Sequence, residues 1–209
     1  DGTLVDTAPD LMAAHNHVMK KFGYPQKKLE DIKNIAGRGA WIMMQRTFRD
    51  EIKDEKLKKE MVKEFIDYYA KNIDKASKPI KGVIDFLNWA KSKQILMGVC
   101  TNKQERLAID LLKKINLFQY FEYVAGCDTF EFNKPDPRHL TNVIEIIGGD
   151  LNKSIMVGDS EVDSLSAHSA RIPFILVEEG YTEKNTNEIP HKTLIKDFSN
   201  FEKIIKDYL

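Results

Sequence analysis

The chain changes pattern near residue 78, and this change constrains its fold more than any other feature of the sequence. Before that point apolar residues recur at helical spacing, as at Leu11, Val18 and Phe22, and we expect no strand there. After it, short apolar runs alternate with helical stretches, beginning with ILMGVC at residues 95–100. Alternating strands and helices are typical of a parallel sheet covered by helices on both faces. The sequence therefore predicts an all-helical block followed by an α/β block.

The element boundaries follow from the same periodicities and from turn residues. Helices are expected over residues 8–23, 38–49, about 54–73, 82–92, 104–115, 136–147, 160–170 and 199–208. Buried strands are expected over residues 95–100, 123–125, 154–157 and 174–177. Thr7 is expected to cap the first helix. With linkers near residues 7–9 and 77–79, residues 1–9 and 79–209 form an α/β core and residues 10–78 an inserted helical domain.

Composition narrows the class of protein. The 209 residues carry 32 Lys and Arg against 32 Asp and Glu, so charge gives no reason to expect nucleic acid or an anionic membrane as partner. No apolar run approaches the roughly 18 residues needed to cross a bilayer. The two cysteines, Cys100 and Cys127, have no metal-like spacing, which favours a reducing, cytoplasmic location. A monomer and a homodimer both stay open.

Polar residues gather where the predicted strands end. In an open parallel sheet, ligands bind at the carboxyl ends of the strands. The segments at or near these ends are Asp1-Gly2-Thr3, Thr101-Asn102-Lys103, Lys134-Pro135-Asp136-Pro137 and Gly158-Asp159-Ser160 with Asp163. Carboxylates suit a hard cation such as Mg²⁺, whereas a hydroxyl, backbone N–H groups and a lysine suit a phosphate. Together they indicate phosphoryl chemistry.

Each of these residues also has a purely structural interpretation. Thr101 and Asp159 could each cap a following helix, and Lys134 could be a solvated loop lysine. Asp163 would favour the dipole of a helix in whose first turn it lies. The functional interpretation depends on their joint occurrence, in order, at strand ends.

The four segments resemble, in order, the four motifs of the haloacid dehalogenase superfamily. The opening DGT is similar to the end of the first motif, Asp-x-Asp-Gly-Thr. Within the superfamily the chain is most similar to phosphoglycolate phosphatases, through TAPDL at residues 7–11, GRG at 37–39 and KPDPRHL at 134–140. The resemblance covers essentially the whole chain. It implies a Rossmann-like parallel sheet with a helical cap inserted between the first and second motifs.

The resemblance also implies a Mg²⁺-dependent enzyme that forms an aspartyl-phosphate. The nucleophile would be the first Asp of the first motif, two positions before Asp1. We therefore expect an upstream segment of roughly 5–10 mostly apolar residues, as suits a strand, ending in Asp-x. The Asp1 side chain would protonate the leaving alkoxide and then activate water, and the Asp1 backbone carbonyl would bind Mg²⁺. Dehalogenases lack an acid at this position, so Asp1 favours phosphate esters.

The remaining motif residues take roles from the same resemblance. Thr101 would hydrogen-bond the phosphoryl group with Asn102 beside it, and Lys134 would neutralise nucleophile and phosphate. Asp159 would bind the metal directly. Asp163 would bind it too, or would orient a metal-bound water or Lys134.

Two further residues complete the expected contacts with substrate, a small phosphate ester. Gly2 lies in the first motif, and Arg38 lies in a predicted cap loop. Arg38 could pair with a substrate carboxylate, or it could be a surface arginine between two turn glycines.

The favoured substrate from this resemblance is 2-phosphoglycolate, and three alternatives stay open. One is another small phosphate ester or a pyrophosphate. A second is a phosphotransferase similar to β-phosphoglucomutase, although Leu11 stands where such mutases place a histidine. A third is a non-catalytic binding protein that keeps the fold, although such a protein has no use for Asp1, Thr101, Lys134 and Asp159 together.

Overall fold

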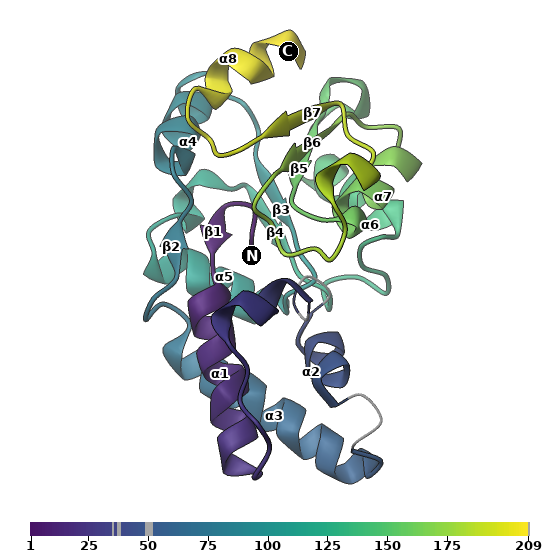
Figure 1. Ribbon diagram of the computed structural model, residues 1–209. Coiled ribbons are helices and arrows are strands. Elements are labelled where there is room, and N and C mark those ends of the chain that lie inside the picture. Colours follow the sequence, from purple (N-terminus) through teal and green to yellow (C-terminus); the bar gives the residue numbers. More distant parts are fainter. Residues whose placement is uncertain (35, 37–38, 49–51, 209) are drawn as a thin grey trace.

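The computed structural model describes residues 1–34, 36, 39–48 and 52–208 of the chain (Figure 1). Its α-helices are α1 (Ala8–Lys21), α2 (Ala40–Phe48), α3 (Glu55–Asn72), α4 (Val83–Ser92), α5 (Glu105–Lys114), α6 (Pro137–Ile146), α7 (Glu161–Ser169) and α8 (Phe201–Ile205). Its strands are β1 (Val5–Asp6), β2 (Lys78–Pro79), β3 (Gly98–Cys100), β4 (Tyr123–Ala125), β5 (Met156–Gly158), β6 (Phe174–Val177) and β7 (Thr193–Ile195). Short 3₁₀ turns are η1 (Leu29–Asn34), η2 (Phe118–Tyr120), η3 (Leu151–Lys153), η4 (Thr186–Glu188) and η5 (Lys206–Tyr208).

The second half of the chain forms parallel sheets, as the sequence predicts. β3 pairs with β4, and β5, β6 and β7 form a second parallel sheet in that order. All four residues of β6 are buried, which explains its uninterrupted apolar sequence FILV. Helices α6 and α7 pack on these strands and on each other. The result is an α/β fold in which the carboxyl ends of the strands lie along one edge of each parallel sheet.

A cavity of about 490 Å³ lies between the two parallel sheets. It is lined by residues of both β3 and β5 and by apolar side chains of α6 such as Val143. Polar residues of the predicted site, among them Asp1, Thr101 and Lys134, line the same cavity. The predicted site therefore opens onto the space between the sheets.

The first half of the chain forms a group of helices, also as predicted. α3 packs against both α1 and α2. The α3 side chains Phe65 and Tyr69, each 1% exposed, pack with Val18 of α1 in one apolar core. Figure 1 shows this group on one side of the strands.

Our prediction of no strand before residue 78 was wrong at the two linkers. Val5 pairs with Pro79 and Asp6 with Lys78, so β1 and β2 form a two-residue antiparallel ribbon. Strands this short leave almost no periodicity in the sequence. The two crossings between helices and sheets thus lie side by side.

Hydrogen bonds from other segments hold both linkers. The buried Asp10 carboxylate accepts from Ala76 N at 3.0 Å and from Ser77 N and Oγ at 2.8 and 2.7 Å. Thr7 precedes α1, but its hydroxyl makes no capping hydrogen bond, contrary to our expectation. Tyr181 Oη instead accepts from the N–H groups of Thr7 and Ala8, both at 2.8 Å. A residue far along the chain therefore completes the start of α1.

Within the described ranges, none of the helices combines the length and apolarity needed to cross a membrane.

Candidate active site

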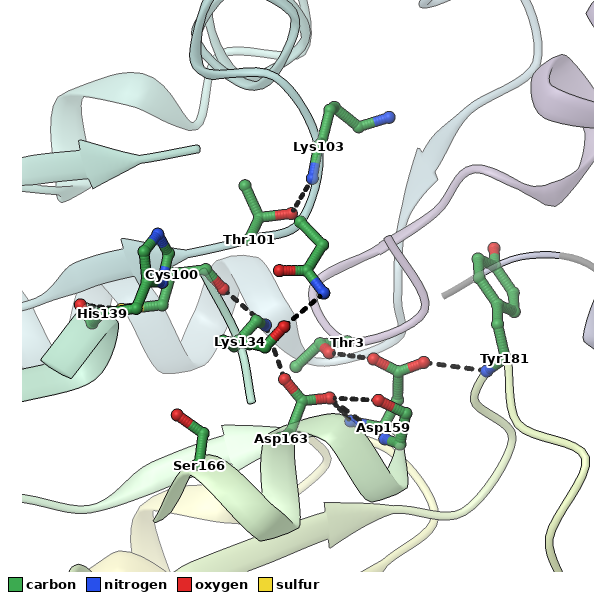
Figure 2. A network of polar contacts seen from close by, with 12 residues as sticks. Thr3, Cys100, Thr101, Lys103, Lys134, His139, Asp159, Asp163, Ser166 and Tyr181 are labelled. Atoms are coloured by element: carbon green, nitrogen blue, oxygen red, sulfur yellow. Dashed lines mark hydrogen bonds and ion pairs between the residues drawn. The ribbon is translucent and has the colours of Figure 1, made fainter. Parts of the chain in front are cut away.

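Lys134 and Asp163 form the buried ion pair at the centre of the site (Figure 2). Lys134 Nζ donates to Asp163 Oδ1 at 2.6 Å and to the backbone carbonyl of Cys100 at 2.7 Å. The side chains are 10% and 4% exposed. Burial lowers the pKa of Lys134, but the charge of Asp163 and its hydrogen bond outweigh burial, so the pKa is raised. Lys134 is therefore a fixed buried cation and not a solvated loop lysine.

Asp163 has a second structural role at the start of α7. Its Oδ2 accepts from the backbone N–H groups of Asp159 and Ser160 and from Ser160 Oγ at 2.8 Å. Ser160 is the N-cap and Asp163 closes the capping box, so Asp159 does not cap this helix. Burial raises the pKa of Asp163, but Lys134 and Ser160 outweigh it, so the pKa is lowered. Both Asp163 oxygens thus have protein partners.

Asp159 lies beside this pair and is 6% exposed. Oδ1 accepts from Thr3 Oγ1 at 2.6 Å, and Oδ2 accepts from Tyr181 N at 2.8 Å. In the part of the chain that the structure describes, no lysine or arginine side chain pairs with it. Burial and the charge of Asp163 raise its pKa. Asp159 is therefore a buried carboxylate whose charge a cation would stabilise.

Gly2 is packed directly on Asp159. Its φ is +73°, a region that favours glycine, and a Cβ at this position would overlap the Asp159 carboxylate. The backbone of the first motif therefore approaches Asp159 closely, which brings the predicted residues Asp1, Gly2 and Asp159 together.

Thr101 and Asn102 lie at the end of β3, as predicted. Thr101 N donates to Ala125 O at 3.0 Å, which continues the ladder, and Thr101 Oγ1 accepts from Lys103 N at 3.1 Å. The N-cap of α5 is Gln104, so Thr101 is not a helix cap. Among the residues that the structure describes, none accepts the hydroxyl proton of Thr101, which is therefore available to a phosphoryl oxygen.

The Asn102 side chain braces the loop that carries the lysine. Asn102 Nδ2 donates to the backbone carbonyl of Lys134 at 3.1 Å. Its Oδ1 is buried and without a hydrogen-bond partner among the described residues. Asn102 therefore connects the second and third motifs directly.

Asp1 lies against Lys103. The Asp1 Oδ1 atom is 2.9 Å from Lys103 Nζ, an ion pair whose angles do not make a hydrogen bond. Lys103 Nζ donates instead to Tyr69 Oη of α3 at 2.8 Å. Burial lowers the pKa of Lys103 to about 7.

The predicted cap loop reaches the site at Gly39. Gly39 has a φ of +87°, and a Cβ there would lie 2.8 Å from the backbone oxygen of Asn102. Arg38, the predicted substrate contact, lies outside the described residues.

Sequence reasoning missed three residues that support the site. Thr3 and Lys103 stand inside the first and second motif segments, so proximity in sequence could have indicated them. Tyr181 carries no such signal, because it reaches Asp159 and Thr7 only through the fold.

Protein groups that could bind a metal ion are few. Among the residues with a described placement, no cluster of three or more His, Cys, Asp or Glu side chains is arranged for a metal. Asp159 nevertheless fits Mg²⁺, because it is a hard oxygen ligand whose buried charge lacks a cationic side-chain partner there. The backbone carbonyl of Asp1 is a second oxygen of the right kind. These two groups would supply part of a magnesium coordination shell.

Comparison with known proteins agrees with this geometry. Residues 1–177 match the model of the family described as haloacid dehalogenase-like hydrolase. The chain is 39% identical to "Phosphoglycolate phosphatase" of Agrobacterium fabrum over 212 residues, covering 98% of this chain and 91% of that protein. It is 36% identical to "Phosphoglycolate phosphatase" of Mesorhizobium japonicum, covering 95% and 88%.

Solved structures show the same fold. The crystal structure of a predicted phosphoglycolate phosphatase from Haemophilus somnus superposes with a TM-score of 0.91 at 25% identity, covering 98% of this chain and 94% of that one. This agreement extends over core and helical insert alike. The chain belongs to the haloacid dehalogenase-like hydrolase family, with an α/β parallel-sheet core and an inserted helical cap.

Proposed function

We propose that this protein is a Mg²⁺-dependent phosphomonoester hydrolase that acts on 2-phosphoglycolate through an aspartyl-phosphate. The observation that carries the proposal is the convergence of a buried lysine, the acid Asp1 and the under-compensated carboxylate Asp159 on one cavity. Phosphoryl transfer to a carboxylate brings anions together, so it requires such fixed positive charge. The names of the relatives at 36–39% identity support the substrate.

We assign the nucleophile to the aspartate expected two positions before Asp1. Its strand would occupy the cavity between β3 and β5, whose apolar lining and position beside Thr101 and Lys134 suit a buried strand that ends in an acid. Such a strand would also pair with the free edges of both sheets.

The residues of this chain then have separate roles in the reaction. Lys134, held by Asp163 and the Cys100 carbonyl, offsets the negative charge of nucleophile and phosphate. Thr101 donates its hydroxyl proton to a phosphoryl oxygen, with Gly2 and Asn102 beside it. Asp1 gives a proton to the leaving alkoxide, which general acid catalysis favours by on the order of 10²–10⁴ in rate, and later takes one from water.

Asp159 and the Asp1 carbonyl would hold Mg²⁺, with Asp163 acting through Lys134 or a metal-bound water. When bound, the ion supplies positive charge next to the phosphate. The Asp163 oxygens already have protein partners, which supports the indirect role.

We assign residues 10–78 to a cap and residues 1–9 and 79–209 to the catalytic core. The packing of Gly39 against Asn102 supports this division, because it brings the cap loop to the second motif. A cap that closes over the ester would exclude water. Arg38 would pair with the carboxylate of phosphoglycolate.

A cytoplasmic location fits the two free cysteines, Cys100 and Cys127. The partner is the small ester, with no role for nucleic acid or membrane. A monomer and a homodimer suit this chemistry equally.

The main alternative is a mutase similar to β-phosphoglucomutase. Leu11 stands at the position of the mutase histidine and is buried in the apolar core, where it has a packing role. Incubation with a sugar phosphate would separate the two activities, because a mutase returns an isomeric sugar phosphate and a hydrolase releases inorganic phosphate.

The proposal is tested by phosphate release from 2-phosphoglycolate and p-nitrophenyl phosphate, with the full-length protein. We expect turnover with Mg²⁺ and none after chelation by EDTA, restored by added Mg²⁺. Absence of turnover with Mg²⁺ would support the non-catalytic alternative. Turnover that is equal with and without metal would contradict the magnesium site. A phosphate-ester panel ranked by kcat/KM would test the substrate.

A further inference from the structure

Lys103 is a buried lysine that the proposed mechanism does not use. Its side chain is 7% exposed, although lysine rarely lies inside a protein without partners. Its Nζ has two partners, Tyr69 Oη at 2.8 Å and Asp1 Oδ1 at 2.9 Å. The ammonium also lies 4.3 Å from the centroid of the Tyr69 ring, a cation–π distance. A buried amine with these contacts is fixed in position.

The two partners come from different parts of the molecule. Tyr69 belongs to α3 of the cap and is 1% exposed, whereas Asp1 belongs to the first motif in the core. Lys103 itself follows the second motif at the end of β3. A single side chain therefore connects the cap, the second motif and the acid of the first motif.

The Asp1 carboxyl depends on this connection. Its Oδ1 is buried and makes no hydrogen bond within the described part of the chain, so the ammonium of Lys103 is the contact that holds it. Proton transfer to a leaving oxygen requires the acid to lie within hydrogen-bond reach. A carboxyl released from Lys103 would sample other rotamers, and the protonation step would slow.

We propose that Lys103 is a positioning residue that holds the Asp1 carboxyl for proton transfer, and that Tyr69 makes this hold depend on the placement of α3. The inference rests on the proposed function, in which Asp1 is the general acid. It gives the cap a second task besides covering the substrate. A cap displaced at α3 removes the hydrogen bond that orients Lys103, so proton transfer is efficient only when the cap is in place.

The test uses two esters of similar shape that differ in the basicity of the leaving group. Phenyl phosphate releases a more basic oxygen than p-nitrophenyl phosphate, so it needs the acid more. The value of kcat/KM reports the steps up to departure of that oxygen, before water enters. A merely structural defect lowers kcat/KM for both esters alike, whereas a misplaced acid lowers it more for phenyl phosphate.

We expect Lys103→Met to lower kcat/KM for phenyl phosphate by on the order of 10²-fold, as loss of general acid help does, and for p-nitrophenyl phosphate by much less. Tyr69→Phe keeps the ring and removes one hydrogen bond to a charged group, so we expect a loss of about tenfold on phenyl phosphate. The matched controls are Lys114→Met on α5, whose ammonium pairs with Asp74, and Tyr68→Phe, whose ring stacks on His17. Both controls should leave the ratio of the two esters unchanged.

The outcomes separate this inference from the proposed function. In one outcome, the wild-type protein hydrolyses both esters while Lys103→Met lowers kcat/KM for both by the same factor. In that case Lys103 has only a structural role, and the inference is overturned. If Tyr69→Phe and Tyr68→Phe have the same kcat/KM for each of the two esters, the dependence on α3 is overturned. If the wild-type protein hydrolyses neither ester with Mg²⁺, the proposed function itself fails. Circular dichroism and the melting temperature of each variant would identify a protein that failed to fold. If Lys103→Met does not fold, the ratio of kcat/KM for the two esters in Tyr69→Phe, the mildest change, decides whether the inference holds.

Discussion

Lys134 Nζ lies 2.6 Å from Asp163 Oδ1, and the same ammonium donates to the carbonyl of Cys100. One side chain thus joins the third motif to the fourth and to the last residue of β3. Because removal of the lysine would leave the buried Asp163 carboxylate without its cationic partner, Lys134 has a structural as well as a chemical role.

Replacing this lysine should therefore affect both activity and stability. We expect Lys134→Ala to lower kcat/KM by on the order of 10²–10³-fold, the usual effect of removing one electrostatic contributor. We also expect it to lower the free energy of unfolding by about 3–5 kcal/mol, because Asp163 stays buried without its partner. Steady-state kinetics and urea unfolding would measure the two effects, with Lys114→Ala as control. A loss of activity under about tenfold would contradict the assigned role.

Asp159 should destabilise the folded protein when no metal is bound. Burial and the charge of Asp163 raise its pKa, so the folded state binds more protons than the unfolded state above pH ~3.9. Stability from this group is therefore lost as pH rises from about 4 through the raised folded pKa. We expect Asp159→Asn to raise the melting temperature at pH 7 without Mg²⁺, by roughly 2–4 °C for each kcal/mol. The asparagine amide can still bond Thr3 and Tyr181.

Mg²⁺ and pH provide the controls for this prediction. Mg²⁺ should raise the melting temperature of the wild-type protein but not of Asp159→Asn, which should also lose activity. Asp163→Asn should behave in the opposite sense and lower stability. The pKa of Asp163 is lowered, so its contribution is present above pH ~3.9 and lost as pH falls. An Asp159→Asn protein that melts lower than wild type at pH 7 and higher at pH 3 would reverse the predicted sign.

The contacts of Asp10 predict a large effect of one linker side chain. Its carboxylate accepts from Ala76 N and from both N and Oγ of Ser77. We expect Asp10→Ala to lower the free energy of unfolding by about 2–4 kcal/mol, since it leaves the N–H group of Ala76 and the buried N–H group of Ser77 without acceptors. Ser77→Ala should lower it by only about 1 kcal/mol. Urea denaturation would measure both, and a double-mutant cycle should show strong coupling. Additive effects would mean that the two residues act independently.

Arg38 is predicted to recognise the substrate carboxylate. We expect Arg38→Ala to raise KM for 2-phosphoglycolate by on the order of ten- to a hundredfold, the value of a hydrogen bond between charged groups. Ethyl phosphate has no carboxylate and should be unaffected. Arg106→Ala on the exposed side of α5 is the matched control. Equal losses on the two esters would exclude Arg38 as the specificity residue.

The fold could be predicted from the sequence where burial dictates the pattern. β6 was predicted to the residue because all of its side chains are buried. The run at residues 95–100 was predicted too long, because Met97 N donates to the Glu122 carboxylate and β3 begins at Gly98. β7 was missed, since only Ile195 of its three residues is buried and the rest resembles a polar loop.

The site, like the fold, contains residues that the sequence predicts and residues that it does not. The motif residues were predictable because their chemistry is concentrated at strand ends. Tyr181 was not, because it contacts Thr7 and Asp159 only after the chain has folded. Long-range partners of this kind leave no local signal.

The ribbon formed by β1 and β2 should restrict movement of the cap relative to the core. Both chain crossings run through it, with Val5 opposite Pro79 and Asp6 opposite Lys78, so one crossing cannot bend without the other. Two separate tethers would allow the helices to twist and slide in several directions. A single hinge allows mainly rotation of the cap about one axis, which runs through the ribbon. The entrance for substrate should therefore lie between the cap and the core on the side opposite the ribbon, and the products should leave by the same side.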